Sequence, residues 1–147
     1  MLMEQGETFI DYIGPAWIRI GPDGATVLLE VHKQHTNPNG SVHGGVLMTL
    51  MDVALGSSVE GVLANAQPQG HPITMQFSCN LVGAARLGEL LRLEAQVDRL
   101  TRSVGFASGR ISVGDKLVMT ASAVFKNPSV PQDGRPRVQA DPRAAPV

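Results

Sequence analysis

A long apolar segment in the first half of the chain constrains the fold more than any other feature. From Gly45 onward, apolar and small residues recur three or four positions apart in two neighbouring stripes: Val46, Leu50, Val53 and Ser57, then Leu47, Met51, Ala54 and Ser58. This spacing predicts a helix of about 17–20 residues that is apolar on most of its surface. Such a helix has to be buried, and in a chain of 147 residues the remaining elements must form the layer that covers it.

The segments on either side of this helix predict strands. Before it, the runs AWIRI and ATVLLEVHK are joined by the turn residues Gly21-Pro22-Asp23-Gly24. After it come four runs with partial alternation of apolar and polar residues: ITMQFSCNLV, ELLRLEAQVDRL, SVGFASGRISV and KLVMTASAVFK. Gly114-Asp115, between the last two runs, is a strong hairpin signal. We therefore expect an α+β fold in which an antiparallel sheet wraps the long buried helix, with the last four strands as a meander.

The N-terminal residues predict a short helix rather than a signal peptide. Phe9, Tyr12 and Ile13 lie at helical spacing and Gly14-Pro15 would end the helix, so we expect it at about residues 5–13. The segment before it carries acidic and no basic residues, whereas a signal peptide starts with a basic region.

The C-terminal residues have a different composition from the rest of the chain. From Asn127 onward, half of the ten prolines fall within 21 residues that show no apolar periodicity. We expect one domain over residues 1–127 and a flexible, Pro-rich tail over residues 128–147.

Charge and cysteine content exclude several classes of protein. The net charge is −1, so the chain lacks the basic surface that nucleic-acid binding requires. A single cysteine, Cys79, permits neither an internal disulfide nor a cysteine metal cluster, which favours a reducing compartment. The mostly apolar run Val46–Leu55 contains Asp52 and is too short to span a bilayer. The sequence thus predicts a cytoplasmic protein that binds neither a membrane nor a nucleic acid.

Asp52 is the one charged residue inside the apolar core of the long helix. Burying a carboxylate costs several kcal/mol unless it is paired or lines a cavity. The simpler interpretation is a half-exposed surface position, but Met51, Val53 and Leu55 around it favour a buried site. Asp52 is therefore a candidate catalytic carboxylate.

The same helix begins at His43-Gly44-Gly45, where two consecutive residues have no side chain; we call this segment the helix entrance. The first N–H groups of a helix have no internal partner, and the helix dipole adds partial positive charge there. Because Gly44 and Gly45 have no Cβ, these groups could bind a carbonyl oxygen or an oxyanion. The alternative is that the glycines only permit a tight turn into the helix.

The distance between Asp52 and the helix entrance limits how the two could form one site. Asp52 lies seven residues after Gly45, about 10 Å along a helix axis that rises roughly 1.5 Å per residue. Groups that act on one reacting carbonyl must each lie within about 3–3.5 Å of it. If both features act in catalysis, two copies of the helix must meet antiparallel across a two-fold axis, so the site would be shared between subunits.

Several motifs of the sequence resemble those of a known family. The segment NPNGSVHGGVLMTLMDVALGSS is similar to the signature of the hotdog-fold acyl-CoA thioesterases, and within them to the PaaI-like and 4-hydroxybenzoyl-CoA thioesterase group with its H-G-G…D pattern. The resemblance extends to HTN before the loop, to Thr74 at the start of the next strand, and to RLGE and DRLTR. It covers residues 8–127. It implies a hotdog fold that dimerises by sheet extension, and usually a tetramer of two dimers.

The resemblance also implies roles for single residues in hydrolysing an acyl-CoA with an aryl, phenylacetyl or medium-chain acyl group. Asp52 would be the general base for water, or the nucleophile that forms a mixed anhydride. The Gly45 N–H would polarise the thioester carbonyl, perhaps helped by Gly44, with His43 beside the site. Asn37 would position the thioester or the water, and Thr74 would hold the water near Asp52 of the same subunit.

Coenzyme A is part of the implied substrate, so no separate cofactor is expected. Arg102, and less firmly Arg99 and Lys126, would contact its phosphates; the alternative for these residues is simple solvation of charges on a hairpin. A metal site is not expected, because side chains three apart on a strand, as His32 and His35 would be if the strand continued, point to opposite faces, and His43 and His71 are scattered.

Two other functions stay open. A hotdog dehydratase or hydratase acting on acyl-CoA or acyl-carrier protein needs a histidine base for a Cα proton, whereas His43 followed by two glycines suits thioester polarisation better. Crotonyl-CoA would distinguish the two through its enoyl absorbance. A non-catalytic acyl-CoA-binding module has no need of Asp52, and would bind acyl-CoA without releasing thiol.

Overall fold

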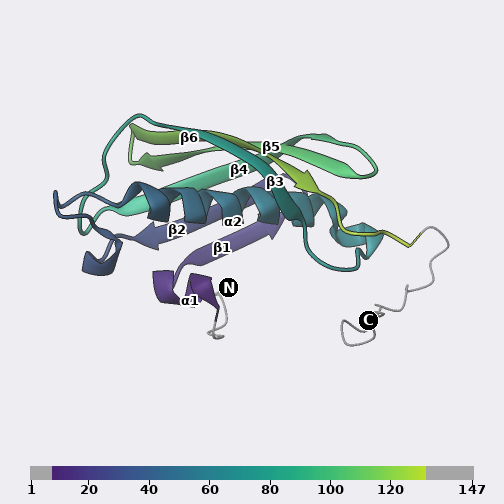
Figure 1. The fold of residues 1–147 in the computed structure, drawn as a ribbon, viewed down its shortest axis with the longest axis horizontal. Coiled ribbons are helices and arrows are strands. Elements are labelled where there is room, and N and C mark those ends of the chain that lie inside the picture. Colours follow the sequence, from purple (N-terminus) through teal and green to yellow (C-terminus); the bar gives the residue numbers. More distant parts are fainter. Residues whose placement is uncertain (1–7, 132–147) are drawn as a thin grey trace, which may run out of the picture.

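The computed structural model describes residues 8–131. In chain order its elements are α1 (Phe9–Ile13), β1 (Trp17–Gly21), β2 (Gly24–Glu30), the 3-10 helix η1 (Lys33–His35), α2 (Gly44–Leu63), the 3-10 helix η2 (Ala64–Ala66), β3 (Ile73–Leu81), β4 (Leu90–Leu100), β5 (Val104–Val113) and β6 (Lys116–Lys126). The six strands form one antiparallel sheet in the order β1-β2-β4-β5-β6-β3. The sheet curls around α2, which contacts every strand (Figure 1). The expected α+β fold, with a long helix wrapped by an antiparallel sheet, is confirmed.

Apolar side chains of α2 form the centre of the core. Met51 and Leu55 are fully buried, and burying a side chain of this size contributes about 1.5–3 kcal/mol. Gly61 lets the helix approach β1 closely, because a Cβ at this position would lie 2.3 Å from the Gly21 carbonyl oxygen. The periodicity of the sequence therefore identified the element around which the fold is built.

The length of α2, 20 residues, agrees with the prediction, but the apolar segment is longer than the run Val46–Leu55 that the sequence analysis judged too short to span a bilayer. Residues 44–66 have the length and mean hydropathy of a membrane span, and half of the most apolar window is buried within the protein. A single such helix is weak evidence for a membrane, since the core helix of a soluble protein has the same composition. Packing against the sheet accounts for the apolar character of α2.

The expected meander is wrong for β3. This strand pairs with β6, not with β4, so the segment between β3 and β4 crosses the end of the sheet. The crossing brings backbones close together: the N–H groups of Val82 and Gly83 both donate to the Val118 carbonyl. A Cβ on Gly83 would lie 2.5 Å from the Leu117 carbonyl oxygen. This pairing places β3 at a free edge of the sheet.

The Gly114-Asp115 hairpin is confirmed, with Val113 paired to Lys116.

The strand expected to run to Lys33 ends at Glu30 and is followed by η1. His32 and His35 therefore lie on a turn, and the expectation that they point to opposite faces of a strand is wrong. Their rings are 5.9 Å apart in an edge-to-face arrangement. Within residues 8–131, no three His, Cys, Asp or Glu side chains are grouped as metal ligands would be.

The two ends of the described chain fall within the predicted N-terminal helix and the predicted C-terminal tail. A short N-terminal helix is present as α1; residues 5–7 of the expected helix lie outside the described residues. At the other end, Ser129 forms an isolated β-bridge with Gln69, so the first residues of the expected tail still contact the domain. Residues 132–147 of the expected tail lie outside the described residues.

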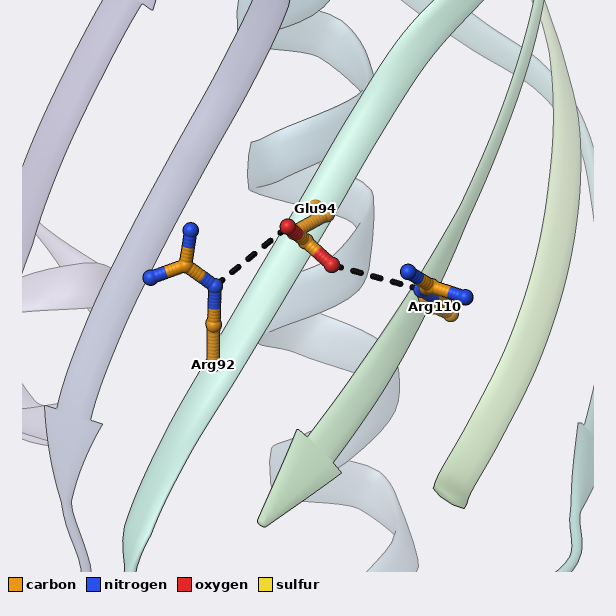
Figure 2. A network of polar contacts seen from close by, with 3 residues as sticks. All are labelled: Arg92, Glu94 and Arg110. Carbon is orange, nitrogen blue, oxygen red and sulfur yellow. Dashed lines mark hydrogen bonds and ion pairs between the residues drawn. The ribbon is translucent and has the colours of Figure 1, made fainter. Parts of the chain in front are cut away.

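The face of the sheet opposite α2 carries polar side chains. Figure 2 shows Glu94 of β4 between Arg92 and Arg110, with Nε–oxygen distances of 3.3 Å to each. Partial desolvation raises the pKa of Glu94, but hydrogen bonds and charge attraction from the two arginines outweigh it and lower the pKa below its usual value. The side chains are well exposed, so this network contributes little to stability.

Candidate active site

Asp52 lies in the middle of α2, and its side chain meets the beginning of β3. The Thr74 hydroxyl donates a hydrogen bond of 2.7 Å to Asp52 Oδ1. Thr74 pairs across the sheet with Phe125, which is buried in the core, so both side chains lie on the face of the sheet toward α2. The structure thus brings together, within one chain, the carboxylate and the hydroxyl that the sequence suggested.

Asp52 is more exposed than its apolar neighbours suggested. Within one chain it is half-buried, whereas the adjacent Met51 is fully buried. The expectation of a deeply buried carboxylate is wrong for the single chain, because the sheet covers only part of the helix. Four residues at helical spacing form a half-buried stripe along the uncovered side: Gly45, Thr49, Asp52 and Gly56.

His43 caps the N-terminus of α2 with its own ring. Its Nδ1 accepts the Gly45 N–H at 2.9 Å. A ring nitrogen that accepts this bond carries no proton, so the proton of the neutral ring is on Nε2. The Gly45 N–H, expected to polarise a carbonyl, therefore already has an acceptor, whereas the Gly44 N–H makes no hydrogen bond within residues 8–131.

Asn37 is used in shaping the loop before α2. Its Oδ1 accepts the N–H groups of Asn39, at 2.9 Å, and Ser41, at 3.3 Å, and its Nδ2 donates to Ser41 Oγ at 3.1 Å. Within residues 8–131, no hydrogen bond joins Asn37 to Asp52, Thr74 or His43. In this structure Asn37 therefore contributes to the site through the loop that leads to His43.

Two of the three expected phosphate ligands share a pocket. Arg102 and Lys126 line a hollow of about 440 Å³ together with Ser103, Asn127 and residues 128–131. Neither cation forms an ion pair with a carboxylate in the described part of the chain. The pocket thus carries two positive charges that no carboxylate of residues 8–131 pairs with.

Arg99 lies outside this pocket. It pairs with Phe106 on β5 and is exposed. Two larger hollows, of about 610 and 670 Å³, lie on the outer face of the sheet and beside β1. Asp52 lines none of the three, so one chain does not enclose its own carboxylate in any of these pockets.

Two buried polar residues near these features were missed in the sequence. Asn127 follows β6 directly; its N–H donates to the Ser103 carbonyl at 2.9 Å and its Nδ2 to the Thr101 carbonyl at 2.8 Å. These bonds fix the turn that carries Arg102. His35, the other buried residue, precedes the loop containing Asn37. The motif HTN was a signal for His35, whereas Asn127 looked like the first residue of the tail.

Comparisons with known proteins identify the family to which the chain belongs. The family model described as the thioesterase superfamily matches residues 39–124. The chain is 35% identical over 120 residues to the candidate esterase PA0474 of Pseudomonas aeruginosa, covering 81% of this chain and 87% of that protein. It is 25% identical over 92 residues to acyl-coenzyme A thioesterase 13 of Mus musculus, 62% of each chain.

A solved structure supports the same fold. A hypothetical thioesterase protein of Streptococcus pneumoniae, solved with coenzyme A, superposes with a TM-score of 0.73 at 21% identity, covering 82% of this chain and 91% of that one.

The matched segment includes the helix entrance, Asp52 and Thr74, and spans more than half of the 147 residues. This chain therefore belongs to the thioesterase superfamily, the thioester hydrolases, and it has their hotdog fold.

Proposed function

We propose that this protein hydrolyses an acyl-CoA thioester to a free acid and coenzyme A, as a member of the PaaI-like and 4-hydroxybenzoyl-CoA thioesterase group. The observation that carries the proposal is the hydrogen bond from Thr74 to Asp52 on the uncovered side of α2. A mouse relative is named as an acyl-coenzyme A thioesterase, and a structural relative was solved with coenzyme A. The reaction needs no further cofactor.

Asp52 acts in this proposal as a general base. It takes a proton from a water molecule, and the water oxygen attacks the thioester carbonyl carbon. The tetrahedral intermediate then collapses, the C–S bond breaks, and the proton held by Asp52 passes to the coenzyme A sulfur. Because the Thr74 hydroxyl donates to Asp52 Oδ1, its oxygen can accept a hydrogen bond from the water. This arrangement holds the water beside the base.

The helix entrance stabilises the negative charge that develops on the carbonyl oxygen. The N–H groups of Gly44 and Gly45 point from the positive end of α2. Releasing the Gly45 N–H from His43 Nδ1 exchanges one hydrogen bond for another, which costs little free energy. The freed ring, with its proton on Nε2, then lies beside the thioester.

The site is shared between two copies of the chain. Asp52 and Gly45 lie on one continuous helix, about 10 Å apart along its axis. The free-edge strand β3 exposes Ile73, Met75 and Leu81 by 62%, 61% and 48%. An exposed apolar edge strand invites pairing with another chain. Pairing of two β3 strands would extend the sheet and bring Asp52 of each copy toward the helix entrance of the other; two such dimers would form the tetramer usual in the family.

The basic pocket binds the phosphates of coenzyme A. Among the described residues, Arg102 and Lys126 form no ion pair, and they line a hollow large enough for a phosphate group; Arg99 on β4 adds to the positive potential. The proposed function is tested by measuring thiol release from benzoyl-, phenylacetyl- and octanoyl-CoA. No release from any acyl-CoA of such a panel would reject it, and conversion of crotonyl-CoA at its double bond would favour the hydratase.

Removing the Thr74 hydroxyl should slow hydrolysis without abolishing it. Thr74→Val keeps the shape but loses a hydrogen bond to a charged group, so we expect kcat to fall about 10- to 100-fold. Thr74→Ser keeps the hydroxyl and should retain most of the activity. Steady-state kinetics check this result; equal losses in the two variants would show that the hydroxyl is not what matters.

Removing the cations of the basic pocket should weaken binding of the nucleotide part of the substrate. We expect Arg102→Ala and Lys126→Ala each to raise KM for an acyl-CoA about 3- to 10-fold with little change in kcat. KM for the matching acyl-pantetheine, which lacks the nucleotide phosphates, should not change. Lys116→Ala is the control. Lys116 begins β6, the strand that Lys126 ends, and its amino group already faces the Glu89 carboxylate at 3.8 Å. An equal rise in KM for both substrates would contradict a phosphate site.

A further inference from the structure

His35 is a buried histidine that the proposed mechanism does not use. It is 1% exposed and lies on η1, between β2 and the loop that leads to α2. The exposed His32 ring lies edge-on beside it. A buried polar ring is costly unless its nitrogen atoms have hydrogen-bond partners, and both nitrogen atoms of His35 have one.

The two partners fix the protonation of the ring. Nδ1 accepts the His32 N–H at 2.9 Å, and Nε2 lies within hydrogen-bond distance of the Ile13 carbonyl oxygen. A backbone N–H can only donate and a carbonyl oxygen can only accept. His35 is therefore neutral with its proton on Nε2, and this tautomer donates to Ile13.

The bond to Ile13 holds the N-terminal helix against the rest of the protein. Helix α1 has no buried residue, although Ile13 packs partly against the core. The helix ends at Ile13, and the next residue, Gly14, has a φ of 100° and a ψ of −179°, which are adopted almost only by glycine. The conformation of Gly14 thus sets the direction of the chain immediately after the carbonyl that His35 binds.

The backbone of the same residue holds the helix entrance. The His35 carbonyl accepts the His43 N–H at 2.8 Å. Thr36 and Val42 form a β-bridge beside this bond, so the loop between them is closed at its base. His43 in turn accepts the Gly45 N–H. A continuous series of hydrogen bonds therefore joins α1 to the first turn of α2 through His35.

We infer that His35 is a positioning residue, which couples the docking of α1 to the geometry of the helix entrance. Its ring fixes η1 against Ile13, and its carbonyl then fixes His43 relative to Gly44 and Gly45. The kinetic consequence rests on the proposed function, since these groups receive the thioester carbonyl there. The structural coupling itself does not depend on which reaction is catalysed.

The kinetic test compares variants that keep or lose the bond to Ile13. A small displacement of catalytic groups is costly, so His35→Leu should lower kcat about 10- to 100-fold while KM changes less than about 3-fold. His35→Gln can place an amide N–H near the position of Nε2 and should recover most of the lost kcat. If His35→Leu fails to fold, His35→Asn provides the same comparison, since it keeps an acceptor for His32 but is too short for Ile13. Val27→Ala, which leaves a cavity at a buried position of β2, controls for a general loss of stability.

A double variant tests the route of the coupling. Gly14→Ala strains the chain after Ile13 and should lower kcat by itself, but it should add little to His35→Leu because both disturb the same bond. Independent, multiplying losses in the double variant would overturn the inference, as would full activity in a folded His35→Leu protein or a loss confined to KM.

Hydrogen exchange tests the coupling apart from catalysis. The amides of His43 and Gly45 should exchange faster in His35→Leu than in the wild type or Val27→Ala. Unchanged exchange would overturn the inference. If the wild type hydrolyses no acyl-CoA, the proposed function fails, and the exchange measurement still decides whether His35 positions the helix entrance.

Discussion

Asp52→Asn is expected to lower kcat for acyl-CoA hydrolysis by about 10²- to 10⁴-fold, the contribution typical of a general base. The amide has nearly the shape of the carboxylate and can still accept the Thr74 hydrogen bond, so the fold should be unchanged. What it cannot do is take a proton from water. Thiol release under saturating substrate, together with the thermal unfolding curve, measures the two effects separately.

Glu60→Gln is the matched control for this result. Glu60 lies two turns further along α2 and is half-buried like Asp52, but its carboxylate faces His71 at 2.6 Å. Its replacement removes a charge from the same helix and should leave kcat near the wild-type value. Comparable losses in the two variants would indicate a general effect of helix charge, and a fully active, folded Asp52→Asn protein would reject the assignment of the base.

Mixing two inactive variants is expected to restore activity if the site is shared. Gly45→Pro lacks the N–H of the helix entrance but suits the first turn of a helix, and losing such a donor should lower kcat about 10²- to 10³-fold. A heterodimer of Asp52→Asn and Gly45→Pro chains contains one site with both defects and one site with neither. With random pairing, about one quarter of the wild-type activity should return.

The measurement is the activity of the two proteins co-expressed or refolded together, at constant total concentration. A mixture as inactive as its components would show that Asp52 and the helix entrance act within one chain. Gly45→Ala serves as the comparison because it retains the N–H, although its Cβ would lie 3.0 Å from His43 Nδ1 and the ring must shift. We expect it to lose less activity than Gly45→Pro.

The sequence predicted those parts of the fold that depend on neighbours along the chain. The periodicity from Val46 onward identified α2, and the turn at Gly114-Asp115 identified the β5–β6 hairpin. The position of β3 could not be predicted in this way, since its pairing with β6 joins segments that are far apart in sequence. Its place at the free edge depends on the whole sheet, and no local pattern records it.

In the candidate site, too, only some of the contacts could be predicted from the sequence. The family motif predicted that Thr74 of the same subunit holds the water near Asp52; the two side chains are hydrogen-bonded directly, and the role of Thr74 toward water stays a prediction. The bond from Gly45 to His43 Nδ1 was not predicted, because a ring that folds back on its own helix leaves no signature in residue spacing. The exposure of Asp52 was misjudged for a related reason. Apolar neighbours show that a helix is buried somewhere, but they do not distinguish cover by the same chain from cover by a second copy.

Single-turnover hydrolysis in ¹⁸O-labelled water tests the central claim most directly. Wild-type protein in excess over an acyl-CoA should release free coenzyme A and an acid that carries one ¹⁸O atom, because Asp52 directs water onto the thioester carbonyl. The Asp52→Asn protein should release almost none in the same time. Absence of thiol release by the wild type would contradict hydrolysis, and ¹⁸O found in Asp52 instead of the acid would show that the carboxylate attacks the thioester itself.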